Sequence, residues 1–120
     1  MNTNLSSKDI LELAMSKHEK HDLSGAEKLY QEVLNKEDNN FNANFLLGTL
    51  FASTKRYELA VTKLEKARAV NPNNADTYNN LANVYKELNK IELAKKNYNL
   101  ALEIDSKHIN AIDNLGIIYL

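Results

Sequence analysis

The sequence repeats itself with a period of 34 residues. Residues 7–40, 41–74 and 75–108 share one pattern of apolar and small side chains, and residues 109–120 begin a fourth copy. Self-similarity at a fixed period of roughly 20 to 50 residues is typical of proteins built from stacked units, because one unit cannot bury its apolar face alone. We therefore expect one repeat domain over residues 7–120, after a flexible leader at residues 1–6.

Composition indicates that the stacked units are helical. The 120 residues include 43% hydrophobic residues but only 3 glycines and 1 proline, too few for the many tight turns of an all-β domain. The absence of cysteine excludes disulfides, thiolate metal sites and cysteine nucleophiles. A net charge of −1 gives no overall field that attracts nucleic acid or an anionic membrane, so neither is expected as a partner.

Charge is divided unevenly between the repeats. Residues 7–40 hold five Lys/Arg and eight Asp/Glu, a net charge of −3, whereas residues 41–74 hold five and two, a net charge of +3. This division fits either solvated outer faces or a dipolar partner.

Apolar residues recur at helical spacing in seven stretches, separated by short polar breaks. Ser24 and Glu27 read as a capping box, in which each side chain satisfies a backbone N–H near the other. Pro72 ends a helix, and Asn89 occupies a turn that favours left-handed geometry. The predicted fold class is all-α. The expected helices are 7–20, 24–35, 41–53, 57–70, 75–88, 91–104 and one that starts at 109.

Aligning the copies gives columns that predict the core. Columns of small residues let neighbouring helices approach closely, and columns of large residues fill the space between them. Recurrence at the repeat period favours packing over a cofactor site for these residues, and no cofactor is expected. The small columns are Ala14, Gly48, Ala82 and Gly116; Ala26, Ala60 and Ala94; and Val33, Ala67 and Ala101. The large columns are Leu13, Leu47, Leu81 and Leu115; Phe51, Tyr85 and Tyr119; and Tyr30, Leu64 and Tyr98.

These columns resemble the tetratricopeptide repeat family, whose pattern is W-x2-L-G-x2-Y, then A-x3-F, then A and P. The third copy matches it at Tyr78, Leu81, Ala82, Tyr85, Ala94, Tyr98 and Ala101; the second matches at Leu47, Gly48, Phe51, Ala60, Leu64, Ala67 and Pro72. The first copy is weaker, with Lys17 where an aromatic residue is expected. The resemblance implies a right-handed α-solenoid of three helix pairs plus a seventh helix. It also implies a concave groove, lined by the first helix of each pair, in which scaffold proteins hold peptides or partner helices.

The part of the expected groove formed by the third and fourth copies is rich in asparagine. A primary amide both donates and accepts hydrogen bonds, so it can pair with the backbone of an extended peptide of any sequence. Asn80 and Asn114 share one column and resemble the asparagine ladder in the tetratricopeptide arm of O-linked N-acetylglucosamine transferases. An asparagine-rich composition is the competing explanation. The predicted amide wall comprises Asn79, Asn80, Asn83, Asn110 and Asn114.

The other predicted groove residues are Lys86, Thr49 and an apolar patch at the amino-terminal half. The patch fits an apolar anchor of a ligand, the leader around Leu5, or a neighbouring molecule. The five positions of the family's carboxylate clamp hold Leu11, Met15, Leu46, Asp76 and Asn80, so recognition of a peptide C-terminus by that clamp is not expected. The patch consists of Leu11, Met15, Phe45 and Leu46.

No motif predicts catalysis, a metal site or a phosphate loop. His18 and His21 lie three residues apart rather than four, which does not fit a zinc-protease helix, and His108 lies in a loop with no visible partner. No basic segment followed by an apolar run is visible near the start, and no run of 18 apolar residues occurs. We expect a non-catalytic, cytoplasmic interaction module.

The last stretch, residues 109–120, is apolar and has only Asp113 as a charge. Bare, it would expose a large apolar patch. Two explanations stay open: the chain is a fragment of a longer protein, or the stretch mediates self-association. Two function classes follow: an adaptor that binds an extended peptide or partner helix, or the substrate-docking arm of a larger enzyme such as a glycosyltransferase.

Overall fold

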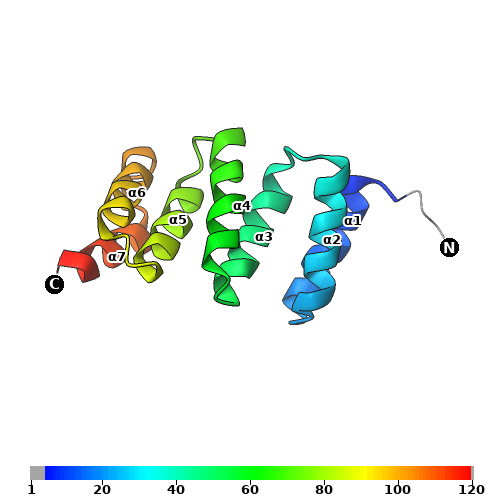
Figure 1. Ribbon diagram of the computed structural model, residues 1–120. Helices are drawn as coiled ribbons and strands as arrows, with labels where there is room; N and C mark the ends of the chain where they lie inside the picture. The colour runs from blue at the N-terminus through cyan, green and yellow to red at the C-terminus, as the bar shows by residue number, and fades with distance from the viewer. Residues whose placement is uncertain (1–4, 120) are drawn as a thin grey trace.

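The computed structural model describes the backbone of residues 5–119 and the side chains of residues 5–118. This part of the chain forms seven α-helices and no strand, so the predicted all-α class is confirmed (Figure 1). The helices are α1 (Ser7–Glu19), α2 (Leu23–Lys36), α3 (Phe41–Ser53), α4 (Tyr57–Val70), α5 (Ala75–Glu87), α6 (Ile91–Ile104) and α7 (Ile109–Tyr119). Most of the leader, residues 1–4, lies outside the described residues.

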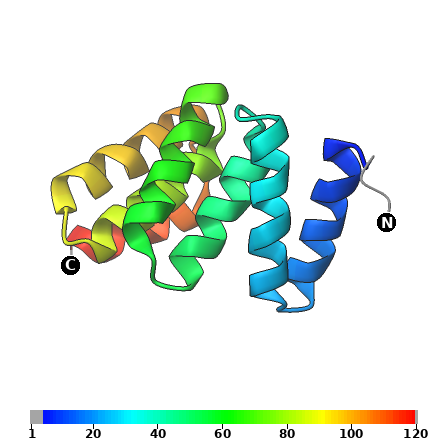
Figure 2. The same cartoon turned by 45° about the vertical axis from the view of Figure 1, so that its right-hand side comes forward.

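The helices stack as successive pairs in an elongated array with extents of 54 × 25 × 21 Å (Figures 1 and 2). Each helix packs on the next one along the chain, and α3 also contacts α5, as α5 contacts α7. The first helices α3, α5 and α7 therefore lie next to one another. Their shared face is the one on which a groove is expected.

The small-residue columns lie where helices meet. Ala14 and Ala82 are fully buried, and so are Ala26, Ala60 and Ala94. Gly48 shows why the column must be small: a Cβ built on it would lie 2.7 Å from Cγ of Leu64 on α4. Gly116 of the same column has no atom within 4 Å of such a Cβ, so its face of α7 is uncovered.

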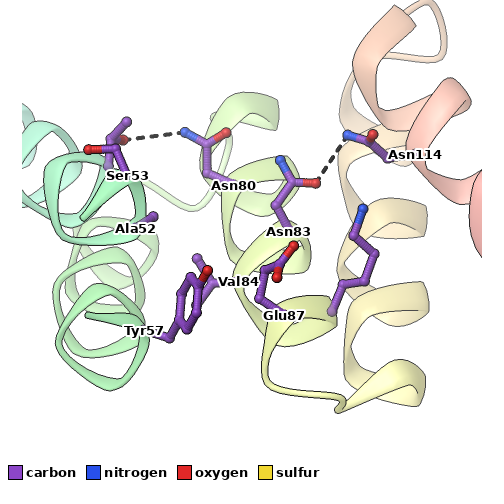
Figure 3. Close-up of a pocket in the computed structure, with 10 residues that line it drawn as sticks. Ala52, Ser53, Tyr57, Asn80, Asn83, Val84, Glu87 and Asn114 are labelled. Atoms are coloured by element: carbon purple, nitrogen blue, oxygen red, sulfur yellow. Dashed lines mark hydrogen bonds between the residues drawn. The ribbon is translucent and has the colours of Figure 1, made fainter. Parts of the chain in front are cut away.

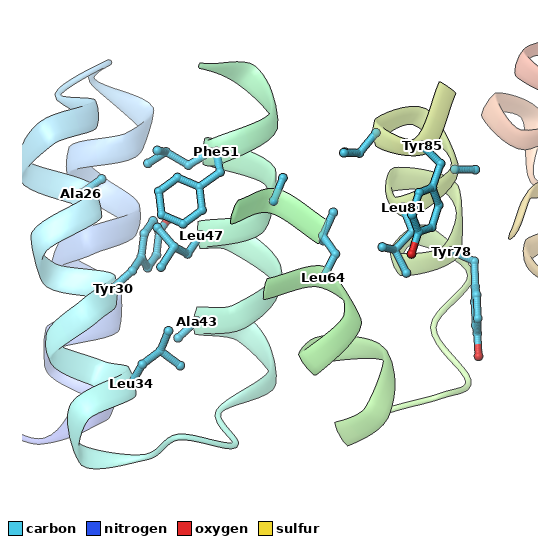
Figure 4. Packing of buried hydrophobic residues seen from close by; sticks show 14 of the residues in the cluster. Ala26, Tyr30, Leu34, Ala43, Leu47, Phe51, Leu64, Tyr78, Leu81 and Tyr85 are labelled. Atoms are coloured by element: carbon cyan, nitrogen blue, oxygen red, sulfur yellow. The ribbon is translucent and has the colours of Figure 1, made fainter. Parts of the chain in front are cut away.

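The large-residue columns form one continuous core between the pairs (Figure 4). Tyr30, Leu64 and Tyr98 are fully buried, as expected. Leu81 is fully buried as well, but Leu13 of the same column is 44% exposed, so its prediction as a core residue is wrong. This column packs toward the preceding repeat, and no helix precedes α1 among the described residues. The Tyr119 side chain lies outside the described part.

One turn geometry recurs in all three pairs. His21, Lys55 and Asn89 adopt left-handed φ values of 62°, 64° and 61°, which confirms the expectation for Asn89. The predicted capping box at Ser24 is wrong. Asp22, directly after the left-handed residue, caps α2 by accepting a hydrogen bond of 3.0 Å from the Gly25 N–H. The left-handed residue His21 places Asp22 at the N-cap position, so Ser24 lies within the first turn of α2.

Opposite charges of the first two repeats pair with each other across their boundary. Arg56, before α4, makes a two-pronged contact with Glu27 of α2 at 2.7 and 3.2 Å, and its guanidinium lies 4.6 Å from the Phe51 ring centroid. Lys66 lies 2.7 Å from Asp38 and holds the pKa of that carboxyl below its ordinary value. Part of the charge division seen in the sequence is thus used between repeats.

Candidate peptide-binding groove

Two cavities open on the face shared by the first helices. The smaller, of about 180 Å³, lies between α1 and α3, and the larger, of about 470 Å³, extends from α3 across α5 to α7 (Figure 3). The smaller is lined by Met15, His18, Glu19, Tyr30 and Leu46. The larger is lined by Thr49, Ala52, Ser53, Tyr57, Asn80, Asn83, Val84, Lys86, Glu87 and Asn114.

Most lining residues fall on four positions of the 34-residue repeat. Three come from one first helix, and the fourth comes from the first helix of the next repeat. We call these sets of four the junction sites. The first junction site is Met15, His18, Glu19 and Leu46; the second is Thr49, Ala52, Ser53 and Asn80; the third is Asn83, Lys86, Glu87 and Asn114. The groove is therefore as periodic as the core.

A chain of side-chain hydrogen bonds runs along the floor of the larger cavity; Figure 3 shows two of its bonds, one at Asn80 and one between Asn83 and Asn114. Asn80 donates to Oγ1 of Thr49 on α3 at 3.4 Å and accepts from the Asn79 amide, also at 3.4 Å. Asn114 of α7 donates to Oδ1 of Asn79 at 3.4 Å and to Oδ1 of Asn83 at 3.1 Å. Four of the five predicted amides thus meet and connect three repeats.

The orientation of the Asn83 amide is set by its neighbours. Its Oδ1 accepts from Asn114 and also from the Tyr98 hydroxyl, which is buried on α6. With its oxygen engaged by two donors, the amide turns its NH2 group away from both of them. Among the side chains of residues 5–118 and the backbone of residues 5–119, no partner contacts the Asn83 NH2 group, so the amide offers the groove a donor.

Burial raises the pKa of the tyrosine hydroxyls that lie beneath the groove. It raises the pKa of Tyr98 to about 12, and the nearby charge of Glu87 adds to that rise. Burial likewise raises the pKa of Tyr30 to about 12, and its hydroxyl lies 2.9 Å from Nδ1 of His18. Both hydroxyls therefore stay neutral near pH 7 and act as hydrogen-bonding supports for groove residues.

Seven of the ten predicted site residues line a cavity. They are Met15 and Leu46 in the smaller one, and Thr49, Asn80, Asn83, Lys86 and Asn114 in the larger.

Three predicted residues lie elsewhere. Asn79, predicted as part of the amide wall, is only 5% exposed and bonds to Asn80 and Asn114, so it supports the wall and does not face the groove. Phe45 stacks on Phe41 with ring centroids 5.7 Å apart and lines neither cavity. Asn110 is exposed and also lies outside both linings.

Some lining residues were missed by the sequence pattern. Tyr57, the first residue of α4, and Val84, a buried residue of α5, both line the larger cavity. Tyr57 belongs to a second helix, and the expectation that only first helices line the groove omitted it. Its position directly after a three-residue turn from α3 is the signal that would have found it.

His108 corrects a further expectation, because the structure gives it two partners. Its Nδ1 accepts a hydrogen bond of 3.1 Å from the Ala111 N–H at the start of α7, and its Nε2 lies 2.6 Å from Oδ1 of Asp76 on α5. An Nδ1 that accepts leaves the proton on Nε2, which donates to the carboxylate. His108 thus caps α7 and ties it to α5.

Within the described part of the chain, no three His, Cys, Asp or Glu side chains gather as a metal site would require. None of its helices has the length and apolar character needed to cross a membrane.

Two sequence profiles of one family match the chain. The profile described as "TPR repeat" matches residues 48–89, and the one described as "Tetratricopeptide repeat" matches residues 75–108. This chain belongs to the tetratricopeptide repeat family. Such repeats are helical protein-interaction modules that generally have no catalytic activity of their own.

Individual proteins are similar over most of the chain. Human protein O-mannosyl-transferase TMTC3 is 34% identical over 97 residues, which are 80% of this chain and 11% of that protein. The chain spans about a tenth of the length of the curated relatives it matches. The Thermobaculum terrenum O-GlcNAc transferase is 28% identical with a TM-score of 0.88, covering 98% of this chain and 23% of that one. The first tetratricopeptide domain of Spaghetti (RPAP3), bound to the HSP90 peptide SRMEEVD, has a TM-score of 0.90 at 19% identity, covering 98% and 96%.

Proposed function

We propose that this chain is a non-catalytic adaptor that holds an extended peptide segment of a partner protein in the groove along α1, α3, α5 and α7. The observation that carries the proposal is the amide chain on the floor of the larger cavity. Its internal bonds fix how the amides are turned before any ligand arrives, and an ordered site loses less conformational entropy on binding.

Pairing with a peptide backbone requires a donor and an acceptor side by side. The Asn83 NH2 group supplies the donor. Asn114 uses its NH2 group for Asn79 and Asn83, and within residues 5–119 no donor contacts its carbonyl oxygen, which supplies the acceptor. These groups suit the C=O and N–H of an extended chain. The peptide-bound Spaghetti (RPAP3) domain supports a peptide as the ligand class through its fold alone.

Each such hydrogen bond contributes only about 1 kcal/mol net, so affinity has to come from several bonds together with apolar contacts. Tyr57 and Val84 provide apolar surface in the larger cavity, and Met15 and Leu46 provide it in the smaller. We therefore expect moderate affinity that is spread along the groove.

The test is to select binders from a random twelve-residue peptide library displayed on phage and to titrate the enriched peptides by fluorescence anisotropy. The double variant Asn80→Ala/Asn114→Ala removes two amides of the wall. Its affinity should fall about tenfold, as expected for the loss of bonds worth somewhat over 1 kcal/mol together. Asn99→Ala is the matched control, because Asn99 is an exposed asparagine on α6 and lines neither cavity. Unchanged affinity in the double variant, with melting temperatures maintained, contradicts the amide wall.

A second candidate function is the docking arm of a larger enzyme. The similarity to two glycosyl-transferring proteins, of which this chain covers only 11% and 23%, favours it. In that case the groove would hold the enzyme's protein substrate. Sequencing the native transcript past the codon for Leu120 separates the two candidates, since a transferase domain in the same reading frame would replace the free adaptor.

The uncovered face of α7 suits a second kind of partner, another copy of this chain. Ile109, Ile112 and Ile117 are 71%, 47% and 59% exposed, and Gly116 lies open among them. We propose that this face pairs with α7 of a second copy, because Ile112 and Gly116 lie one helical turn apart and an antiparallel pair places each copy's isoleucine on the other's glycine. Sedimentation over a range of concentrations should show a monomer–dimer equilibrium that Ile112→Lys abolishes. A wild-type chain that stays monomeric at the highest concentration contradicts the pairing.

A further inference from the structure

The three junction sites have the same geometry but different chemistry. Corresponding residues lie 34 positions apart along the chain, so each site repeats the arrangement of the one before it. The adjacent first helices α3, α5 and α7 contact one another in sequence. Packed helices lie about 8–10 Å apart, and an extended chain advances about 3.3 Å per residue. One junction site therefore corresponds to about three residues of an extended ligand.

The first junction site combines an apolar pair, Met15 and Leu46, with His18 and the exposed Glu19. Met15 is 43% exposed, and Leu46 is partly buried beside it. Nδ1 of His18 is engaged by the Tyr30 hydroxyl, so the inward edge of this ring has its partner within the protein. An unbranched thioether adapts to apolar shapes of different size. This site suits a leucine-like or aromatic side chain.

The second junction site is small and its hydroxyls are already engaged. Thr49 donates to the Phe45 carbonyl at 2.9 Å, and Ser53 donates to the Leu50 carbonyl at 2.8 Å. Ala52 adds no polar group. The site has little to offer a long or charged side chain and accepts a small one.

The third junction site contains a cation that the other two sites lack. The Asn83 NH2 group faces the groove, and Lys86 lines the same cavity half-buried. Within residues 5–119, no acidic group pairs with the Lys86 ammonium. Glu87 is the competing charge on this rim, and it is exposed. The Lys86 ammonium suits a carboxylate side chain, while the Asn83 NH2 group and the Asn114 carbonyl stay available to the peptide backbone.

We propose that the groove reads an extended peptide at a fixed spacing, with an apolar side chain in the first junction site and an Asp or Glu side chain at Lys86 in the third. Two repeat steps separate these sites, which corresponds to about six residues of peptide. The residue midway between them is small. This inference rests on the proposed peptide-binding function and adds the chemical class of the ligand.

The test uses the same random twelve-residue library with the full chain. Peptides enriched on the wild-type protein should share an apolar and an acidic residue about six positions apart. Selection on Lys86→Gln should keep the apolar residue and lose the acidic one, and Met15→Gln should do the reverse. Lys96→Gln, an exposed lysine on α6, is the control and should select the wild-type pattern.

The Glu87→Gln variant tests the sign of the ligand charge at the third junction site. If a carboxylate lies at the third site, removing the Glu87 charge raises affinity for the enriched peptides, whereas Lys86→Gln lowers it about fivefold, as for loss of an exposed ion pair. If Glu87→Gln binds the enriched peptides more weakly than the wild type, the site prefers a cation, and this result overturns the inference. Enriched peptides without the spaced pair overturn the inference alone. The absence of any enriched peptide overturns the proposed function as well.

Discussion

The first and third repeats share their core but not their groove. Ala14 and Ala82 occupy one buried column, and Tyr30 and Tyr98 occupy another. At the groove, Met15 in the first repeat corresponds to Asn83 in the third, and the column that holds Leu46 holds Asn114 two repeats later. The fold depends on the columns that stay constant, so the chemistry of the remaining columns is free to differ. An array of this kind can change its ligand without changing its scaffold.

The core that the first and third repeats share is tested most severely at high pH. Burial raises the pKa of Tyr30, Tyr85 and Tyr98 from 10.0 to about 12. The fold keeps these phenols neutral, so the stability they contribute is present below the unfolded pKa near 10 and is lost as the pH rises toward 12. We expect cooperative unfolding in that window, seen by circular dichroism together with tyrosinate absorbance.

Equivalent tyrosines should then respond equally. Tyr30→Phe and Tyr98→Phe each remove one buried ionisable group and should move the alkaline transition upward by similar amounts. A shift in only one variant would show that the first and third cores differ.

Leu81 and Leu13 belong to one column but differ in burial, at 0% and 44% exposed. Leu81→Ala should lower the free energy of unfolding by about 2–5 kcal/mol, the usual cost of a cavity in a packed core. Leu13→Ala should change it by about 0.5 kcal/mol or less, as at most surface positions. Denaturant titration measures both. Equal losses would mean that Leu13 is covered in solution.

The same substitution at Gly48 and at Gly116 tests whether a neighbouring helix covers each glycine. In Gly48→Ala the new methyl group meets Leu64, and overpacking of about 1–3 kcal/mol outweighs the gain in helix propensity of up to about 1 kcal/mol. In Gly116→Ala the new methyl group meets no neighbouring atom, so only the gain in helix propensity remains. Thermal melts at low concentration should therefore shift in opposite directions. A destabilised Gly116→Ala chain that is monomeric would contradict the open face of α7.

The smallest expected effect concerns the start of α2. Asp22→Ala removes the cap on Gly25 and should cost about 1 kcal/mol. Ser24→Ala lies within the first turn and should be neutral or slightly stabilising, because alanine has the higher helix propensity. Reversed effects in denaturant titrations would restore Ser24 as the cap.

The repeat period is what made most of the fold predictable. Aligned columns give every helix several copies, and the predicted bounds 41–53, 57–70 and 91–104 agree with α3, α4 and α6. Where the copies differ, the sequence was ambiguous. Asp22 and Ser24 are both good N-cap residues, and only the left-handed turn at His21 decides between them.

Contacts between repeats were the harder part. His108 pairs with Asp76, and Asn79 with Asn114, at separations of 32 and 35 residues that no local pattern reveals. The sequence placed Asn79 beside Asn80 and Asn83 but could not show that it lies beneath them. A polar residue on a first helix can belong to the support of the groove as well as to its surface.

We expect one periodic face of the array, and not the opposite one, to receive the ligand. Two-dimensional amide NMR of the labelled chain, with and without an enriched peptide, tests it most directly. We expect the largest shifts at the side-chain NH2 signals of Asn83 and Asn114 and at backbone amides of α3, α5 and α7, with α2, α4 and α6 little changed. Shifts concentrated on α2, α4 and α6 would contradict the account.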